Sequence, residues 1–408
     1  MLVISDTPTL AGFCRRLEQA DYITVDTEFM RERTYWPRLC LVQVAGPDEA
    51  AVIDALAEGI ELAPLLQLMT NPKVLKVFHA ARQDIEIFHQ LNGAIPAPLF
   101  DTQIAAMVCG FGDAVGYETL AAKLAHARID KSLRFTDWSH RPLSERQLNY
   151  ALSDVTHLRA AYEKLKRRLK RTGRSGWLEE EMAVLTDPRT YAQDSYEAWR
   201  RLKTRSSDPR FLAVLREVAA WRDKEAQRRD VPRNRVIRDD TVLDIAAQRP
   251  GAARDLDRTR GLVRNQRSPN RNEEILEAVA RGLALPEDQC PRLPERVALP
   301  RGLAPMVDLF KVLLKMKCEA ADVAQKLVAS NTDLELIALD DTAEVPALSG
   351  WRRTVFGEDA LALKHGRLAL TIEGKALELV PRDRETPVEK ASAKGGAAAL
   401  TGRPSQSG

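Results

Sequence analysis

The 408-residue sequence predicts a mixed β-sheet flanked by helices, followed by smaller helical domains. Runs rich in β-branched and aromatic residues, which strands favour, occur at residues 22–29, 39–46, 50–56 and 73–80. The first three runs follow one another without long crossovers. The fourth lies between two segments with helical periodicity. Neighbouring strands followed by strand–helix units are typical of a mixed sheet covered by helices.

The remainder of the sequence is mostly helical in pattern. Residues 143–171 form one long periodic stretch, and Ser144 is a plausible N-cap for it. Strand-like residues reappear only near 368–380. The predicted organisation is a first domain (1–170), a helical connector (171–207), a small helical domain (208–286), a proline-punctuated linker (287–302), a second helical domain (303–381) and a disordered tail (382–408).

Composition places the protein among ordinary globular chains, with 44% hydrophobic and 29% charged residues. The N-terminus lacks a basic stretch before a long apolar run, so no secretion signal is expected. No apolar run reaches about 18 residues, so no membrane association is expected either. The five cysteines show no paired CxxC spacing, which argues against a zinc site or disulfide framework and suits a cytoplasmic protein.

Positive charge is concentrated in one segment. Residues 200–271 contain 20 basic and 10 acidic residues, whereas the whole chain has a net charge of only +3. A solvated helical surface explains such a segment as readily as a polyanion-binding surface does. Candidate nucleic-acid contacts are the arginines around the sequence "DVPRN", namely Arg228, Arg229, Arg233 and Arg235.

Carboxylates occur where a core would favour apolar residues. Asp26 and Glu28 lie two apart on a strand and therefore share one face. Asp84 follows a later strand at the start of a helix, and Tyr150 and Asp154 lie four apart on the long helix. Each feature alone has an ordinary explanation, such as a helix cap. Together, four converging acids suit a pair of hard divalent cations that cleave a phosphodiester.

The motifs "VDTEF", "FHAARQD" and "YALSD", in this order, resemble the DEDD exonucleases of the tyrosine subtype. Position 149 is Asn, which excludes the histidine subtype. The longer run "DTEFMRERTYWPRLCLVQVA" is similar to ribonuclease D enzymes. Residues 208–286 resemble the helicase-and-ribonuclease-D C-terminal (HRDC) domain, and residues 303–380 look like a more diverged second copy. The resemblance implies a ribonuclease-H-like first domain and two HRDC-type domains.

The same resemblance implies a 3′-to-5′ exoribonuclease that releases 5′-mononucleotides from RNA, with tRNA precursors as expected substrates. Asp26, Glu28, Asp84 and Asp154 would hold two Mg²⁺ or Mn²⁺ ions, and Tyr150 would orient the attacking water. Further implied RNA contacts are Phe29, Met30 and His79, although packing in the core explains Phe29 and His79 equally well. Asp101 also resembles a family position, but a helix N-cap explains it.

Two other functions remain open at this stage. The same chemistry could act on DNA, because the residues that would recognise a 2′-hydroxyl are not evident in the sequence. A non-catalytic RNA-binding protein is the second alternative, but such a protein should have lost at least one acid, and all four are present. No obligate protein partner is inferred.

Overall fold

A computed structural model of the chain describes residues 2–134, 136–256, 259, 261–262, 270–293 and 299–382. These residues form two compact units, one within 1–298 and 321–327 and the other within 299–320 and 328–408. The predicted disordered tail, 382–408, lies outside the described residues apart from Arg382. Among the described helices, none combines the length and the apolar character needed to cross a membrane.

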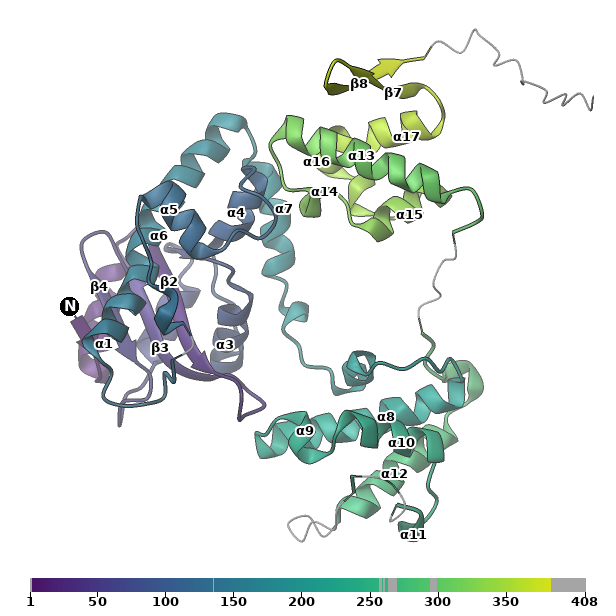
Figure 1. Ribbon diagram of the computed structural model, residues 1–408. Helices are drawn as coiled ribbons and strands as arrows, with labels where there is room; N and C mark the ends of the chain where they lie inside the picture. The colour runs from purple at the N-terminus through teal and green to yellow at the C-terminus, as the bar shows by residue number, and fades with distance from the viewer. Residues whose placement is uncertain are drawn as a thin grey trace, which may run out of the picture. The chain divides into compact units, whose positions relative to one another are not determined.

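A six-stranded mixed sheet forms the centre of the first unit, in the order β1-β4-β3-β2-β5-β6 (Figure 1). Strand β3 runs antiparallel to β2 and β4, and the other neighbouring pairs are parallel. The strands are β1 (Leu2–Ile4), β2 (Tyr22–Met30), β3 (Arg38–Ala45), β4 (Ala50–Asp54), β5 (Leu75–Phe78) and β6 (Leu99–Asp101). The four predicted strands are β2 to β5. Strands β1 and β6 were missed because three residues are too few to show an alternating pattern.

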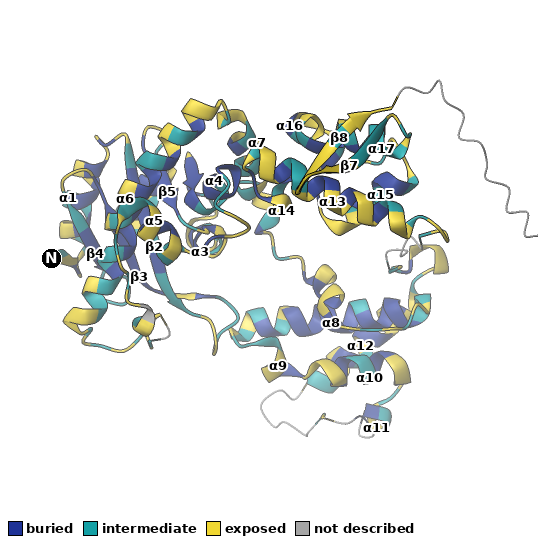
Figure 2. Cartoon of the chain, turned by 45° about the horizontal axis from the view of Figure 1, so that its top comes forward, coloured by how far each residue is buried: buried dark blue, intermediate teal, exposed yellow. Residues whose placement is uncertain are grey.

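Helices cover both faces of this sheet, and the buried residues gather between the layers (Figure 2). One face packs against α1 (Thr7–Leu17), α2 (Ala63–Thr70) and α3 (Arg82–Asn92). The other face packs against α4 (Thr102–Val108), α5 (Tyr117–Ala125) and the long α6 (Glu145–Thr172). Helix α6 starts at the predicted cap, where Ser144 and Gln147 form a reciprocal capping box.

A helical domain follows within the same unit, connected by α7 (Ser175–Leu185) and the 3₁₀ segments η2 (Pro188–Thr190) and η3 (Ser195–Arg201). Its helices are α8 (Pro209–Arg229), α9 (Arg233–Val236), α10 (Asp239–Gln248), α11 (Ala253–Leu256) and α12 (Arg271–Ala284). They enclose a core built around α8, with Leu215, Ile245 and Ile275 fully buried. Two short 3₁₀ turns, η1 (Lys131–Leu133) and η4 (Glu287–Gln289), complete the described elements of this unit.

The segment 321–327 also packs on the first unit. The Ala324 N–H donates to the Met107 carbonyl at 3.0 Å, and Arg168 forms an ion pair with Asp322 at 2.5 Å. This segment contains the end of α13 (Ala304–Ala321) and most of α14 (Gln325–Val328).

The second unit comprises helices followed by a β-hairpin. Its elements are most of α13, then α15 (Asn331–Leu339), η5 (Pro346–Leu348), α16 (Gly350–Arg352), the π-helical turn η6 (Arg353–Gly357), α17 (Glu358–Lys364), β7 (Leu368–Glu373) and β8 (Ala376–Pro381). The antiparallel hairpin confirms the strand-like pattern predicted near 368–380.

Gly282 allows α12 to approach α8 closely, and this contact yields a prediction about stability. A Cβ atom at position 282 would lie 2.6 Å from the Val214 Cα and 2.9 Å from its amide nitrogen. The backbone of α8 would have to move, so Gly282→Ala should destabilise the helical domain by about 1–3 kcal/mol. Chemical denaturation monitored by tryptophan fluorescence measures this change.

Gly176→Ala is the matched control, because its Cβ would meet nothing within 4 Å on helix α7. This substitution should be neutral or stabilise by about 0.5–1 kcal/mol. Equal effects of the two substitutions would contradict the close-packing account.

Candidate active site

The central strand β2 presents carboxylates to one helix layer and a hydroxyl to the other. Asp26 and Glu28 lie on the face covered by α6, where Thr24 on the same face donates to the Val155 carbonyl at 2.8 Å. Thr27 points to the opposite face, and its hydroxyl donates to Asp84 at the start of α3. The pairing with β3 shifts register between Glu28 and Phe29. Such irregularities are frequent beside active sites, where they redirect side chains.

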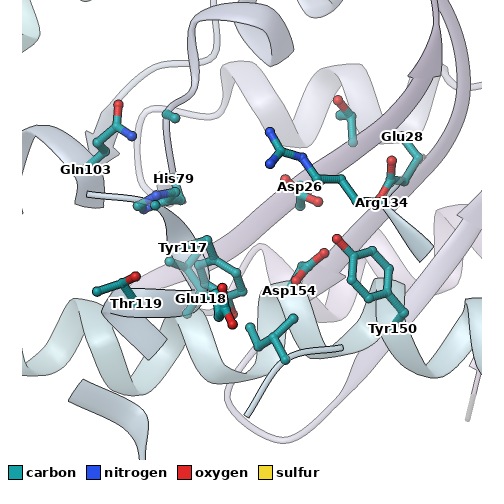
Figure 3. A pocket seen from close by; sticks show the side chains of 15 residues that line it. Asp26, Glu28, His79, Gln103, Tyr117, Glu118, Thr119, Arg134, Tyr150 and Asp154 are labelled. Atoms are coloured by element: carbon teal, nitrogen blue, oxygen red, sulfur yellow. The ribbon is translucent and has the colours of Figure 1, made fainter. Parts of the chain in front are cut away.

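Three carboxylates converge at this point. Ligand atoms of Asp26, Glu28 and Asp154 all lie within 4.8 Å of one another. Asp154 comes from α6, where one turn of helix separates it from Tyr150, and both side chains point toward the β2 acids (Figure 3). These residues line a cavity of about 360 Å³. The structure thus brings together three of the four acids singled out in the sequence, from positions about 130 residues apart.

Asp84 lies near these three acids but is not one of the residues whose ligand atoms come within 4.8 Å of one another. It is buried against Thr27, and its negative charge raises the pKa of Glu28. The turn before α3 is held by Asp101, whose two carboxylate oxygens accept the Ala80 and Ala81 N–H groups at 3.0 and 2.8 Å. Ala80 adopts a left-handed conformation (φ 59°), which is unfavourable for a residue with a Cβ. Asp101 also caps α4, as the sequence indicated.

Burial and mutual repulsion disfavour negative charge on these acids. Burial, followed by the charges of Asp26 and Asp154, raises the pKa of Glu28 to about 10. Burial raises the pKa of Asp154 to about 7, despite a hydrogen bond from Tyr150 that lowers it. Asp154 Oδ1 is buried and accepts no hydrogen bond from the described residues. A hard divalent cation would relieve the repulsion and coordinate this unpartnered oxygen, so the donor set fits such an ion.

Tyr150 is held in place by a stacked tryptophan. The rings of Tyr150 and the buried Trp138 lie 6.1 Å apart between centroids, with an interplanar angle of 25°. The chain after Trp138 is fixed by Arg141, which donates to both oxygens of Asp54 at 2.6 and 2.7 Å and to the Trp138 carbonyl. Burial, then the charges of Asp154 and Glu28, raises the pKa of the Tyr150 phenol. Tyr150 is therefore a neutral donor near neutral pH.

The other residues expected to touch substrate divide into two groups. His79 lines the cavity, with Nδ1 bonded to Thr102 at 2.9 Å and Nε2 buried without a hydrogen-bond partner among the described residues. Phe29 packs partly buried against the main core, and Met30 packs against the cluster around Trp138. The described residues that line the cavity include neither of them. Both side chains, which follow the register shift after Glu28, pack against apolar clusters. Contact of Phe29 and Met30 with the terminal base of the RNA stays a prediction.

Several cavity residues were not found by sequence reasoning. Arg134 lies next to Glu28 and favours its charged form. Tyr117 donates to the Ser153 carbonyl at 2.9 Å, and its ring lies 5.6 Å from His79. Gln103 and Glu118 complete the polar wall (Figure 3). Arg134 lies in an irregular loop and Tyr117 begins an ordinary helix, so no local pattern distinguishes either residue.

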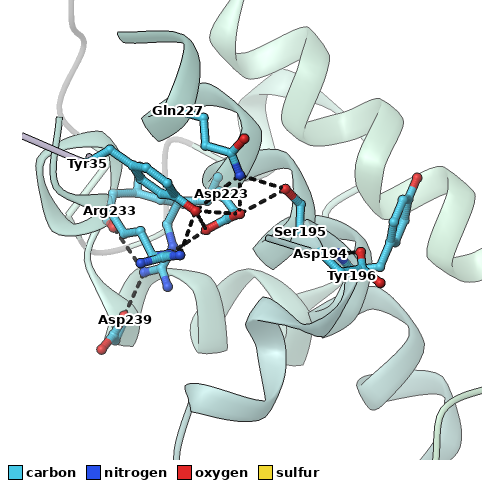
Figure 4. A network of polar contacts seen from close by, with 10 residues as sticks. Tyr35, Asp194, Ser195, Tyr196, Asp223, Gln227, Arg233 and Asp239 are labelled. Atoms are coloured by element: carbon cyan, nitrogen blue, oxygen red, sulfur yellow. Dashed lines mark hydrogen bonds and ion pairs between the residues drawn. The ribbon is translucent and has the colours of Figure 1, made fainter. Parts of the chain in front are cut away.

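Three of the four predicted arginines, Arg228, Arg229 and Arg233, are engaged in contacts within the protein. Arg228 pairs with Glu225 at 2.7 Å, and Arg229 lies 3.9 Å from the same carboxylate. Arg233 pairs with the buried Asp223 and stacks over the ring of Tyr35 in the β2–β3 loop (Figure 4). The guanidinium group of Arg233 thus lies at the junction between the six-stranded sheet domain and the helical domain. RNA contact by these arginines and by Arg235 stays a prediction.

Comparison with known proteins defines the class of the two parts of the first unit. Residues 1–170 match the 3′-5′ exonuclease family, and residues 211–279 match the HRDC domain family. Members of the DEDD group of exonucleases generally use divalent metal ions, which agrees with the cluster of three carboxylates. The acids, the tyrosine and the cavity therefore lie in an exonuclease domain.

Relatives that span nearly the whole chain identify the family. Ribonuclease D of Gluconacetobacter diazotrophicus is 51% identical over 93% of this chain and 97% of its own length. Ribonuclease D of Nitrobacter hamburgensis is 52% identical over 91% and 97%. The crystal structure of Escherichia coli RNase D, described as an exoribonuclease involved in structured RNA processing, matches with a TM-score of 0.74 and 29% identity, over 89% of this chain and 98% of that one. The chain belongs to the ribonuclease D family and is a 3′-to-5′ exoribonuclease.

The raised pKa values predict how cation binding depends on pH. When folding raises the pKa of an acid, the folded state binds the proton more tightly than the unfolded state does. The resulting contribution to stability is fully present below the pKa of the unfolded state, about 4, and is lost as pH rises through the pKa of the folded state. For Asp154 and Glu28 this loss extends from about pH 4 past neutrality. Bound cations favour the charged carboxylates, so the increase in Tm produced by Mg²⁺ should be larger at pH 8.5 than at pH 6.

Thermal unfolding in EDTA and in saturating Mg²⁺ at both pH values measures this difference. Asp26→Asn should make the Mg²⁺ effect small at both pH values, because an amide is a poor ligand for a hard cation. A Mg²⁺-dependent shift in the unaltered protein that is independent of pH would contradict the linkage.

Proposed function

We propose that this exoribonuclease hydrolyses RNA from the 3′ end one nucleotide at a time, with two divalent cations, Mg²⁺ or Mn²⁺, and with tRNA precursors among its substrates. The observation that carries the proposal is the convergence of Asp26, Glu28 and Asp154 to within 4.8 Å, around an oxygen of Asp154 that lacks a hydrogen bond. Asp26, Glu28 and Asp154, with Asp84 beside them, would hold the cations. The chemistry supplied by such cations is activation of a water and stabilisation of the leaving oxygen.

The side chains of the cavity have separate tasks in this proposal. Tyr150, held by Trp138, positions the attacking water through its neutral hydroxyl. His79, which lines the cavity, would contact the sugar or phosphate of the terminal nucleotide. Arg134, on the opposite wall, offers positive charge to the phosphate.

The similarity to ribonuclease D enzymes over nearly the whole chain supports RNA as the physiological substrate. We propose that the second helical unit is a diverged HRDC-type domain, so that two such domains accompany the nuclease. All five cysteines are free and buried, which is compatible with a cytoplasmic location. The sequence alone had also left DNA hydrolysis open.

Labelled oligonucleotides distinguish these assignments. Single-stranded RNA and DNA carrying a 3′-terminal or a 5′-terminal label are incubated with the enzyme in Mg²⁺ or EDTA. The proposal expects mononucleotide release from the 3′ end of RNA in Mg²⁺ only. Faster hydrolysis of DNA than of RNA would overturn the assignment of RNA as substrate.

The cation ligands are tested by neutral isosteres. Asp26→Asn and Asp154→Asn should each abolish hydrolysis with little change in fold, since an amide ligates a hard cation poorly. Circular dichroism monitors the fold. The matched control is Asp48→Asn, an exposed acid outside the cavity, which should retain full activity. Normal turnover by either ligand variant at saturating Mg²⁺ would refute the assignment.

Tyr150→Phe removes the hydroxyl and keeps the ring on Trp138. The kcat value should fall by about 10²-fold or more, the scale of a lost proton-transfer or positioning contact. Affinity for Mg²⁺ should hardly change, because the phenol is not a ligand in this scheme. Tyr196→Phe, at an exposed position, controls for loss of a hydroxyl elsewhere. An unaltered kcat for Tyr150→Phe would assign Tyr150 to packing alone.

A further inference from the structure

A second cleft, of about 590 Å³, lies within the first unit beside the exonuclease domain. Its walls come from the β2–β3 loop, the N-terminal half of α3, the connector segments η2 and η3, and the helices α8, α9 and α10. Five arginines line it against two acids: Arg31, Arg82, Arg201, Arg222 and Arg233, with Glu86 and Asp239. Most of the other lining side chains are neutral and polar. The surface is therefore suited to an anion that is itself extended and hydrated.

The arginines of this cleft are unequal in their availability. Arg31 pairs with Glu86, Arg222 with Asp239, and Arg233 with Asp223. By contrast, Arg82 and Arg201 are exposed, and no hydrogen bond or ion pair is found for either within the described part of the chain. The cleft therefore presents two guanidinium groups without an acidic partner among the described residues, those of Arg82 and Arg201. Its other three arginines are neutralised by ion pairs within the protein. Guanidinium groups bind phosphate oxygens through paired donors.

The floor of the cleft is rigid because of the network around Tyr35. The Tyr35 hydroxyl donates to Asp223 at 3.0 Å and accepts from Arg233 at 2.7 Å and from Gln227 at 3.1 Å (Figure 4). Asp223 is only 1% exposed. Burial acts to raise its pKa, but the hydrogen bond from Ser195 and the charge of Arg233 outweigh burial and lower it. This network joins the β2–β3 loop to η3 and α8, so the segments on that side of the cleft are held together.

The cleft and the active site share structural elements. Arg82 precedes Asp84 by two residues in the first turn of α3, and Arg31 follows Glu28 by three residues at the end of β2. The cleft is therefore built in part from the same strand and helix that carry the acids. We propose that this cleft, through Arg82 and Arg201, binds backbone phosphates of the RNA upstream of its 3′ end. This proposal rests on the proposed function for the identity of the ligand.

The test compares two charge-matched double variants of the full-length protein. Arg82→Gln with Arg201→Gln removes the two available charges of the cleft. Arg15→Gln with Arg254→Gln removes two exposed arginines from other surfaces. Binding of a 16-nucleotide single-stranded RNA is measured in EDTA at several salt concentrations. Hydrolysis of a dinucleotide is measured separately in Mg²⁺.

Loss of two phosphate contacts should weaken RNA binding about tenfold near 0.1 M salt and reduce the slope of log K against log salt by about 1.4. The control double variant should retain the affinity and slope of the unaltered protein. Dinucleotide hydrolysis should be unchanged in both, because a dinucleotide is too short to occupy the cleft.

Three results would overturn the proposal: an unchanged slope for the cleft variant, equal weakening by both double variants, or loss of dinucleotide hydrolysis with unaltered RNA binding. The last result would mean that Arg82 affects hydrolysis by positioning Asp84, rather than by binding RNA. Because binding is measured without a cation, failure of the proposed catalytic function would appear separately, as absent dinucleotide hydrolysis by the unaltered protein.

Discussion

Electrostatic repulsion among buried carboxylates is the constraint on which the active site depends. Asp26, Glu28 and Asp154 are held at distances at which their negative charges would repel one another strongly. The pKa of each is raised. Their positions are set by elements that cannot relax independently, the central strand β2 and the 28-residue helix α6. Separation is prevented by the packing of the sheet against the helix layer. The fold therefore holds the carboxylates in positions of mutual repulsion, and a bound divalent cation would offset that repulsion.

Local periodicity explains why much of this arrangement could be predicted from the sequence. The two-residue spacing of Asp26 and Glu28 on a strand, and the four-residue spacing of Tyr150 and Asp154 on a helix, each define a shared face. Burial of apolar neighbours then directs both faces into one layer. The relation of Asp84 to Thr27 was not predicted, because it depends on where α3 begins. That start depends in turn on Asp101 and the left-handed Ala80, a tertiary contact with no local signature.

Charge composition was a weaker guide than periodicity, for a physical reason. The excess of arginines in residues 200–271 was visible in the sequence, but ion pairing is decided by tertiary neighbours. Arg233 is the clearest case: its partners include Asp223 on α8 and Tyr35, almost 200 positions away. Conversely, Arg82 lies outside the arginine-rich segment, so charge composition did not identify it. Net charge over a segment counts paired and available cations alike, whereas recognition of a polyanion depends on the available ones.

The Tyr35 network connects this electrostatic argument to the architecture of the first unit. Strand β2 carries two of the clustered acids, Asp26 and Glu28, and continues into the loop that bears Tyr35. The Tyr35 and Trp36 amides both donate to Asp230, at the end of α8, at 3.0 and 3.1 Å. The helical domain is thus attached to the strand that holds the acids rather than to a distant edge of the sheet. The network that lines part of the arginine-rich cleft is therefore anchored on the same strand that carries Asp26 and Glu28, so the cleft and the acidic cluster depend on one structural element.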